Sequence, residues 1–339
     1  MSDYILGSLG ENLIRLIQSL SNPIFDLYFG VVTTLGDTLP VLIVLVLLYY
    51  TFNKDLMSRM MYLLIFSVHL NSIIKIFFHN PRPYLYDSEF QVTTDALGKS
   101  TSWGAAGYSF PSGHSQTQGA IWGYLFSKIR DNYVYIFGSI LLLSIPLSRS
   151  YLGVHWPSDI IVGTLLGISI AILFIKLEAR YCIQIGEWSD KKKVSIGLLV
   201  SFGLILIGFV SLLMGTFFTF NDPISLNDPG VWLQIDIGTY PGILAGIVIG
   251  QVLEKKYVNF NTSERNKKKT SLRVILGVTS VVFLYLGAKV IDNVAEGVQN
   301  DILWITQVTN YVSYFIIAIF IAFCIPWLFD KVEKRLNFA

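Results

Sequence analysis

Long runs of apolar residues are the feature that most constrains how this chain folds. Several runs are about 17 to 25 residues long, which is the length that a helix needs to cross the hydrocarbon core of a bilayer. Only 14% of the 339 residues are charged, compared with about 25% in an ordinary soluble domain. The sequence therefore predicts an all-α fold, a polytopic transmembrane helical bundle.

About nine spans are expected along the chain. They lie roughly at residues 35–52, 57–78, 112–128, 132–149, 156–177, 194–218, 237–253, 271–290 and 304–328. Residues 1–27 are too polar to cross a bilayer and indicate an amphipathic segment that lies on the membrane surface. The first ten residues lack a basic region followed by an apolar core, so no cleavable signal peptide is expected.

The distribution of Lys and Arg predicts which side of the membrane each connecting segment faces. Segments 178–193 and 254–270 and the C-terminal tail are rich in both residues, which places them in the cytoplasm by the positive-inside rule. Segments 219–236 and 291–303 contain neither residue and are expected outside. The alternation predicts an outward amino terminus and a cytoplasmic carboxyl terminus.

Polar residues concentrate at the outer ends of spans two to five, and glycines recur at helical intervals in the later spans. We expect residues 28–180 to carry the chemistry and residues 190–339 to form an accessory four-helix transmembrane region. In the seventh span, Gly242, Gly246 and Gly250 recur every fourth residue, and such a stripe lets another helix approach closely. Internal packing is the favoured role of the stripe, and the alternatives for this region are a homodimer through the C-terminal spans or substrate entry.

Three short polar clusters interrupt the apolar background. The first runs from Lys75 to Arg82-Pro83, the second is Pro111-Ser112-Gly113-His114, and the third runs from Ser148-Arg149 through His155 to Asp159. Lys75, Arg82 and Arg149 are all expected on the outer side, against the usual bias of positive charge. One such cation is explained by snorkelling to the interface, but three cations together repel each other unless an anion lies between them. A phosphate fits, because Arg offers a fork of donors and Lys a compact charge.

The second cluster predicts backbone donors at the start of a helix. Pro111 suits a first helical turn, and the N–H groups of Ser112 and Gly113 would then lie where the helix dipole favours an anion. Gly113 also lets the backbone approach closely. Alone this is a weak signal, because Pro-Ser-Gly is ordinary turn punctuation.

The third cluster predicts a nucleophile. His155 and Asp159 are four residues apart, so they share a face of a helix or flank its first turn. A carboxylate that accepts a bond from one imidazole nitrogen leaves the other nitrogen free to attack. His69 and His79 are expected to be packed or interfacial residues, whereas the other two of the four histidines, His114 and His155, fall inside the clusters.

Together, the three clusters resemble the signature of the type 2 phosphatidic acid phosphatase superfamily, which also includes the vanadium haloperoxidases. That signature is Lys-x6-Arg-Pro, then Pro-Ser-Gly-His, then Ser-Arg-x5-His-x3-Asp, and the chain matches all of it in order. The likeness covers about residues 25 to 180. It implies a phosphatidic acid phosphatase/haloperoxidase-type helical core and a catalytic transmembrane domain over residues 28–180. The hydrophobic chain argues against the soluble haloperoxidase branch.

The resemblance implies a role for each matched residue. His155 would be the nucleophile that forms a phosphohistidine, Asp159 would orient it, and His114 would be the general acid that then activates water. The phosphoryl oxygens would be held by Lys75, Arg82, Ser112, Gly113 and Arg149. The family requires no metal, and the chain has no carboxylate cluster suited to Mg²⁺, so no cofactor is expected.

A phosphorylated lipid, either a lipid phosphate or a polyprenyl diphosphate, is the expected substrate, hydrolysed at the extracytoplasmic or lumenal face. One alternative is a phosphatase of a soluble sugar phosphate, similar to glucose-6-phosphatase. Another is phosphoryl transfer to an acceptor other than water. A non-catalytic lipid-binding or transport protein is disfavoured, because nucleophile and acid are both present. Nucleic acid is not an expected partner, because no basic groove with interleaved aromatics is visible.

Two further features carry weaker expectations. The 79–110 segment is 32 residues long, and the sequence favours neither a binding loop nor a solvated loop there. The role of residues 84–110 is therefore left open. Cys182 and Cys324 are expected to be unpaired small hydrophobic residues.

Overall fold

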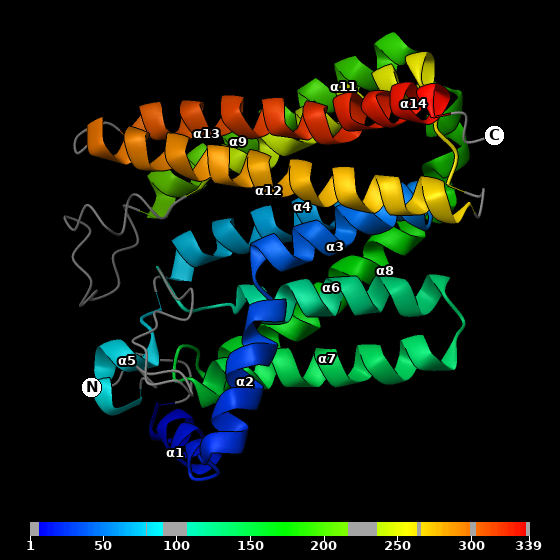
Figure 1. Cartoon of the computed structure of the whole chain (residues 1–339). Helices are drawn as coiled ribbons and strands as arrows, with labels where there is room; N and C mark the ends of the chain where they lie inside the picture. Colours follow the sequence, from blue (N-terminus) through cyan, green and yellow to red (C-terminus); the bar gives the residue numbers. More distant parts are fainter. Residues whose placement is uncertain are drawn as a thin grey trace. The chain divides into compact units, whose positions relative to one another are not determined.

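The computed structural model describes residues 7–78, 80–90, 107–215, 236–262, 266–298 and 303–336, and every regular element in these ranges is a helix (Figure 1). The first helices are α1 (Gly7–Gln18), α2 (Pro23–Leu35), α3 (Thr38–Thr51), α4 (Lys54–Phe78), α5 (Pro83–Tyr86) and the 3-10 turn η1 (Ser88–Phe90). Then come α6 (Gly113–Lys128), α7 (Asn132–Tyr151), α8 (Pro157–Glu187) and α9 (Asp190–Gly215). The last are α11 (Thr239–Tyr257), α12 (Lys267–Val298), α13 (Leu303–Ile319), the π-helix η2 (Phe320–Cys324) and α14 (Ile325–Arg335). The all-α prediction is confirmed.

Two compact units make up the chain, and each is assembled from separate stretches of sequence. Unit 1 comprises Met1–Pro40, Phe66–Ala179 and Val210–Ile235, and unit 2 comprises Val41–Ile65, Arg180–Phe209 and Asp236–Ala339. The division into 28–180 and 190–339 is drawn from composition and stays a prediction.

In unit 1, α6 and α7 lie side by side, and α2 packs against α7 (Figure 1). Helix α2 begins where Asn22 accepts hydrogen bonds from two backbone N–H groups of the first turn and Pro23 supplies a preset φ. The ring of Phe29 packs on that of Tyr151 with centroids 4.4 Å apart. With Leu152 and Val154 these rings form a buried cluster, which supports the chain just before His155.

Helices α6 and α8 approach so closely that their glycines leave no room for a side chain. A Cβ on Gly119 would lie 2.4 Å from the carbonyl oxygen of Thr164, and one on Gly167 would lie 2.1 Å from that of Gln116. Small residues of this kind allow backbone contact between membrane helices. The contact holds the beginning of α6 against the first turns of α8.

Unit 2 is organised around α11, which packs along α13. The glycine stripe makes this contact, because a Cβ on Gly242 would lie 2.4 Å from the carbonyl oxygen of Tyr311 and one on Gly246 equally close to that of Phe315. The stripe therefore serves internal packing. A homodimer through the C-terminal spans stays a prediction.

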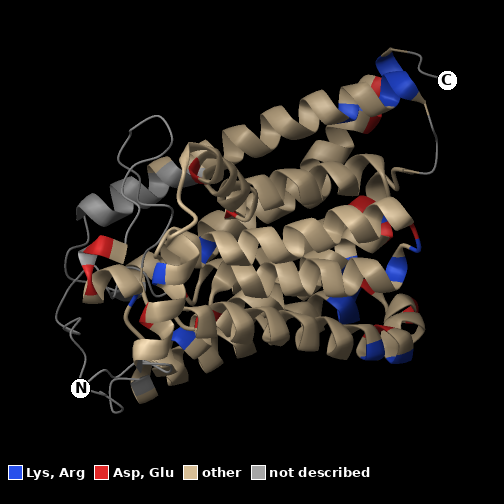
Figure 2. Ribbon diagram, turned by 90° about the horizontal axis from the view of Figure 1, so that it is seen from below, with Lys and Arg blue, Asp and Glu red and all other residues tan. Residues whose placement is uncertain are grey.

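The chain is a multi-pass integral membrane protein. Among the described residues, six helical segments are long and apolar enough to cross a membrane, and α2 with α3 makes a seventh if the pair is one bent span. The segments expected at 112–128 and 237–253 are helical, but α6 has only 16 residues and α11 carries three charged residues in its last turn. In the ribbon of Figure 2, most of the positions coloured as charged residues lie towards the helix ends. The exact count of nine spans is not confirmed.

Candidate active site

The three sequence clusters meet in unit 1, each at the end of a helix. The first follows the last turn of α4, the second begins α6, and the third joins α7 to α8. The most deeply buried members of the clusters are each at most 2% exposed: Arg82, Ser112, Arg149, His155 and Asp159. Buried charges are costly unless they are paired or bind an ion, so their assembly at one place indicates a binding site for a charged group.

A tight turn between α7 and α8 places His155. The carbonyl oxygen of Arg149 accepts hydrogen bonds from the N–H groups of both Val154 and His155, at 3.0 and 3.2 Å. Gly153 has a φ of 69°, a conformation that costs glycine little. The Ser150 hydroxyl then donates to the carbonyl oxygen of His155. These contacts fold the histidine back over the end of α7.

His155 is held between a carboxylate and a guanidinium. Its Nδ1 lies 3.3 Å from Asp159 Oδ2, and its Nε2 lies 3.1 Å from a terminal nitrogen of Arg82. Because arginine is only a donor, Nε2 is the accepting nitrogen and the ring proton is on Nδ1, facing Asp159. The N–H of Trp156 also donates to Asp159 Oδ2 at 2.9 Å and fixes that carboxylate. This tautomer leaves a lone pair on Nε2 for attack on phosphorus.

The surroundings of His155 also favour the neutral ring. Burial, followed by the positive charges of Arg82, Lys75 and Arg149, holds the pKa of His155 well below its ordinary value. The neutral imidazole is the nucleophilic form, so this histidine is ready to react at neutral pH.

Hydrogen bonds donated by its guanidinium hold Arg82 against the third cluster. Its Nε donates to the carbonyl oxygen of Gly107 at 2.8 Å, and its terminal nitrogen donates to that of Val154 at 2.9 Å. The guanidinium thus spans from the segment before α6 to the residue preceding His155. The positive charge held in this position would stabilise the negative charge of a phosphoryl group.

The second cluster is joined to the third through the backbone. The N–H of Ser112 donates to the carbonyl oxygen of Asp159 at 3.1 Å, and a Cβ on Gly163 would lie 2.7 Å from the Ser112 carbonyl oxygen. The expectation that Pro111 lies in the first helical turn is wrong: Ser112 is the N-cap and α6 begins at Gly113. Because the Ser112 N–H is engaged, its hydroxyl is the group left for a phosphate.

Two side-chain amides, one in α4 and one in α6, hold the turn that precedes α6. The Asn71 side-chain amide donates to the Pro111 carbonyl oxygen at 3.2 Å and to the Gln116 side chain at 2.8 Å. Gln116 in turn donates to the carbonyl oxygen of Ser67 at 2.6 Å. This buried network ties the beginning of α6 to α4 and thereby orients the second cluster.

His114 contacts an acidic residue that the motifs do not contain. Its Nε2 lies 3.0 Å from Oδ1 of Asp37, which lies between α2 and α3. Gly36 makes room for the ring, because a Cβ there would lie 2.6 Å from His114 Cδ2. His114 also lies close enough to His155 for the two rings to interact electrostatically.

The remaining two cations complete the cluster. Arg149 donates from a terminal nitrogen to the Thr33 hydroxyl at 2.7 Å. Lys75, in the last turn of α4, interacts electrostatically with Arg82, Arg149 and Asp159. The three cations predicted to share one place therefore do so, and their mutual repulsion favours an anion between them.

All eight predicted site residues lie in unit 1. The contacts above link seven of them through hydrogen bonds or charges, and Gly113 joins the group as the first residue of α6. Their chemical roles stay predictions. Sequence reasoning missed Asp37 and Thr33, because neither lies in a motif and both meet their partners across more than 75 residues. His79 and most of the 84–110 loop lie outside the described residues, whereas His69 is buried in α4.

Electrostatic and acid–base chemistry is what this arrangement offers. It combines a neutral imidazole oriented by a carboxylate, a second imidazole close by, and cations that stabilise charge on a phosphoryl group. Within the described residues no group of three His, Cys, Asp or Glu is placed to hold a metal ion.

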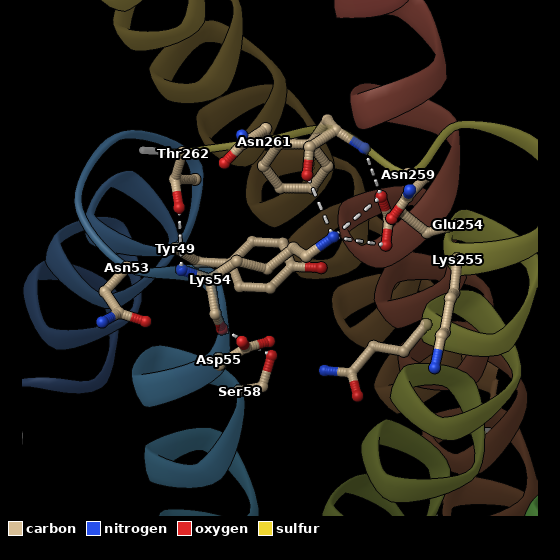
Figure 3. Close-up of a pocket in the computed structure, with 12 residues that line it drawn as sticks. Tyr49, Asn53, Lys54, Asp55, Ser58, Glu254, Lys255, Asn259, Asn261 and Thr262 are labelled. Atoms are coloured by element: carbon tan, nitrogen blue, oxygen red, sulfur yellow. Dashed lines mark hydrogen bonds and ion pairs between the residues drawn. The ribbon is translucent and has the colours of Figure 1, made fainter. Parts of the chain in front are cut away.

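A separate polar cavity of about 570 Å³ lies in unit 2, between the α3–α4 turn and the end of α11 (Figure 3). Its cation Lys54 is already bonded to the Glu254 carboxylate at 3.0 Å and to the carbonyl oxygen of Phe260 at 3.0 Å. A cation with these partners is not available to a phosphate in the way that the unit 1 cluster is.

Comparison with known proteins agrees with the motifs. The PAP2 superfamily model matches residues 56–181, and the model described as PAP2 superfamily phosphatase, transmembrane extension, matches residues 238–336. The chain therefore belongs to the PAP2 superfamily, as the three clusters predicted, and it is a phosphate hydrolase.

Individual relatives differ in how much of the chain they cover. The undecaprenyl-diphosphatase of Sulfolobus acidocaldarius is 40% identical over 74 residues, which are 21% of this chain and 34% of that protein. Glucose-6-phosphatase 2 of Homo sapiens is 20% identical over 311 residues, which are 82% of this chain and 85% of that protein. The crystal structure of Aquifex aeolicus LpxE has 26% identity and a TM-score of 0.43, and the match covers 52% of this chain and 98% of that one.

Proposed function

We propose that the protein hydrolyses a lipid phosphate or a polyprenyl diphosphate through a phosphohistidine on His155. The observation that carries the proposal is the geometry of that ring, with Nδ1 on Asp159 and Nε2 facing the Arg82 guanidinium. A phosphoryl group that draws the Arg82 N–H onto its own oxygens would release the lone pair of Nε2 for attack on phosphorus. His114 would then protonate the leaving oxygen and later activate water.

Apolar surface beside the site supports a lipid as substrate. Leu147 near the end of α7 and Ile161 near the start of α8 are 42% and 57% exposed, so the helix ends that carry Arg149 and Asp159 also present apolar surface. Exposed apolar side chains on membrane helices face lipid tails. A lipid headgroup would therefore reach the cations by lateral diffusion, with its tails against these helices. The 40% identity with an undecaprenyl-diphosphatase over 74 residues agrees with such a substrate.

A soluble sugar phosphate is the second candidate substrate. It is favoured by the match to glucose-6-phosphatase 2, which extends over 82% of this chain and so includes the region after the motifs. Full-length protein in lipid nanodiscs is to be assayed for phosphate release from polyprenyl diphosphate, phosphatidic acid and glucose 6-phosphate. We expect the lipid substrates to have the higher kcat/KM. A preference for glucose 6-phosphate would assign the second function instead.

Substitution of the two histidines tests the mechanism in the same assay. His155→Ala and His114→Ala are expected to abolish phosphate release, because one removes the nucleophile and the other the acid. His69→Gln, which alters a buried histidine outside the clusters, is the matched control and should retain activity. Full activity of the His155 variant would remove the nucleophile assignment.

We further propose that the site faces away from the cytoplasm, on the strength of the Lys and Arg distribution. Single cysteines introduced at Leu20 and at Arg130, in a variant whose Cys182 and Cys324 are replaced by alanine, test the orientation. Both positions are exposed. An impermeant thiol reagent applied to intact cells should label the first and not the second. The reverse labelling would place the site in the cytoplasm.

A further inference from the structure

We propose that Asp37 is a positioning residue for His114: it holds the ring through Nε2 and makes Nδ1 the nitrogen that transfers the proton. The inference rests on the proposed function, since it assigns His114 the acid–base role. It adds a carboxylate outside the three motifs, so that each histidine of the site has its own carboxylate partner.

The contact between Asp37 and His114 has the length of an ordinary hydrogen bond. Asp37 Oδ1 lies 3.0 Å from His114 Nε2, and 77 residues separate the two in the sequence. The His114 side chain is 15% exposed and that of Asp37 is 40% exposed. A carboxylate accepts but does not donate when ionised, so it selects the tautomer or imidazolium in which Nε2 carries a proton. The same logic places the proton of His155 on the nitrogen that faces Asp159.

The backbone between α2 and α3 is built to bring this carboxylate to the ring. Helix α2 ends at Leu35, and the N–H groups of Gly36 and Asp37 bond to carbonyl oxygens of the last turn. A side chain at position 36 would collide with both His114 and Ile145, at 2.6 and 2.7 Å. The glycine therefore allows the ring to lie against the backbone immediately before Asp37.

The contact between Asp37 and His114 would act in both half-reactions, formation of the phosphohistidine and its hydrolysis. In the first, the bond from His155 Nε2 to phosphorus forms, the bond to the leaving oxygen breaks, and the proton on His114 Nδ1 moves to that oxygen. In the second, a water oxygen bonds to phosphorus, the phosphorus–nitrogen bond breaks, and the water proton moves to His114 Nδ1. Asp37 stabilises the imidazolium form and holds the ring direction throughout.

A capping role for Asp37 is the competing explanation, because it immediately precedes α3 and aspartate is a preferred N-cap. Asparagine caps helices about as well as aspartate but lacks the charge that stabilises an imidazolium. Asp37→Asn therefore separates the two roles. If Asp37→Asn does not give a folded protein, Asp37→Ser is the variant to test, because serine also caps helices and carries no charge.

The test compares a phosphate ester that needs an acid with one that does not. p-Nitrophenolate leaves without protonation, so phosphohistidine formation from p-nitrophenyl phosphate should be unaffected by Asp37→Asn within about threefold, while water activation slows. We expect a rapid burst of one p-nitrophenolate per protein followed by turnover reduced about ten- to a hundredfold. An alkyl phosphate has a leaving group that must be protonated. The rate of phosphate release from it should therefore fall by the same factor as the turnover of p-nitrophenyl phosphate, without a burst.

Two controls make the result specific. Asp37→Glu keeps the charge and should restore turnover to within about threefold of the wild type. Asp131→Asn makes the same chemical change at the N-cap of α7 and should leave both rates unchanged. Unchanged turnover in Asp37→Asn, or equal slowing of the burst and of turnover, overturns the proposal. Wild-type protein that releases phosphate from neither ester would instead refute the proposed function.

Discussion

The indole Nε1 of Trp156 donates a hydrogen bond to the carbonyl oxygen of Pro81, 2.8 Å away. The contact joins the residue after His155 to the residue before Arg82. The Ser109 hydroxyl donates a second hydrogen bond to the same carbonyl oxygen, at 3.0 Å. The first and third clusters are thus fastened to each other by hydrogen bonds of the protein itself, and a fixed arrangement of this kind is what preorganised electrostatic stabilisation requires.

Replacing Trp156 by phenylalanine should therefore lower kcat/KM by more than the small loss in the free energy of unfolding can explain. The variant keeps a buried ring but loses the bond to Pro81, so Arg82 and His155 are held less accurately, and we expect kcat/KM to fall about tenfold or more. Trp122→Phe is the matched control, because its indole bonds to Gln118 within α6. Both variants should lose about 1 kcal/mol in the free energy of unfolding. Equal activity of the two would show that the Pro81 bond does not serve the site.

Gly36→Ala should impair catalysis through His114. The added methyl group would lie 2.6 Å from the His114 ring and 2.7 Å from Ile145, so the ring must move away from Asp37. We expect kcat to fall at least tenfold, measured as phosphate release under saturating substrate. Gly203→Ala is the control, because nothing lies within 4 Å of a Cβ at that position. An unimpaired Gly36→Ala variant would mean that the observed ring position is unimportant.

Local spacing explains why much of the candidate site was predictable. His155 and Asp159 are four residues apart, and helix geometry brings such residues together whatever the rest of the fold does. The matched family motifs, rather than any physical calculation, indicated that Lys75 and Arg82 join them. Asp37 and Thr33 were missed because single polar residues near a membrane span carry no local signal. Their partners are set by how α2 packs against α7, which one sequence does not reveal.

One prediction of detail was wrong and another is not confirmed, and both outcomes have physical causes. Proline suits the first helical turn, but Pro111 lies one residue before the N-cap because the Ser112 hydroxyl accepts from the N–H of Ser115 and so caps α6. Hydropathy predicted nine spans, yet α6 is shorter than a bilayer requires. A short helix that packs tightly against α8 through glycines need not itself meet lipid on all sides.

The protonation of His155 predicts how stability depends on pH. Its pKa is lowered in the folded protein, so below about pH 6.5 the unfolded chain takes up a proton that the folded chain does not. Stability should therefore fall as the pH drops from about 6.5 towards 5. In phosphate-free buffer, the melting temperature of the wild type should decline more steeply over this range than that of His155→Asn. Parallel curves would show that the ring is not held neutral by the fold.

Arg149→Lys should retain the charge and lose the function. Arg149 is fully buried and bonded to the Thr33 hydroxyl at 2.7 Å, and a lysine cannot offer two parallel donors to a phosphoryl group. We expect kcat/KM to fall about a hundredfold or more, by analogy with loss of one charge-stabilising donor. Arg15→Lys changes an exposed arginine that pairs with Asp87 and should have no such effect. Similar activity of the two variants would exclude bidentate binding by Arg149.

Vanadate should inhibit the protein, and a chelator should not. A vanadate ion adopts the five-coordinate arrangement of phosphorus during transfer, so a site complementary to that state binds it more tightly than substrate. We expect competitive inhibition below millimolar concentration, measured as phosphate release from the preferred substrate. Arg149→Lys should weaken vanadate binding and lower kcat/KM by similar factors, because both report interactions with the same equatorial oxygens. Treatment with EDTA followed by gel filtration should leave kcat unchanged, since the cations of Lys75, Arg82 and Arg149 supply the positive charge. Insensitivity to millimolar vanadate, or loss of activity that added Mg²⁺ restores, would contradict a mechanism that relies on these side chains.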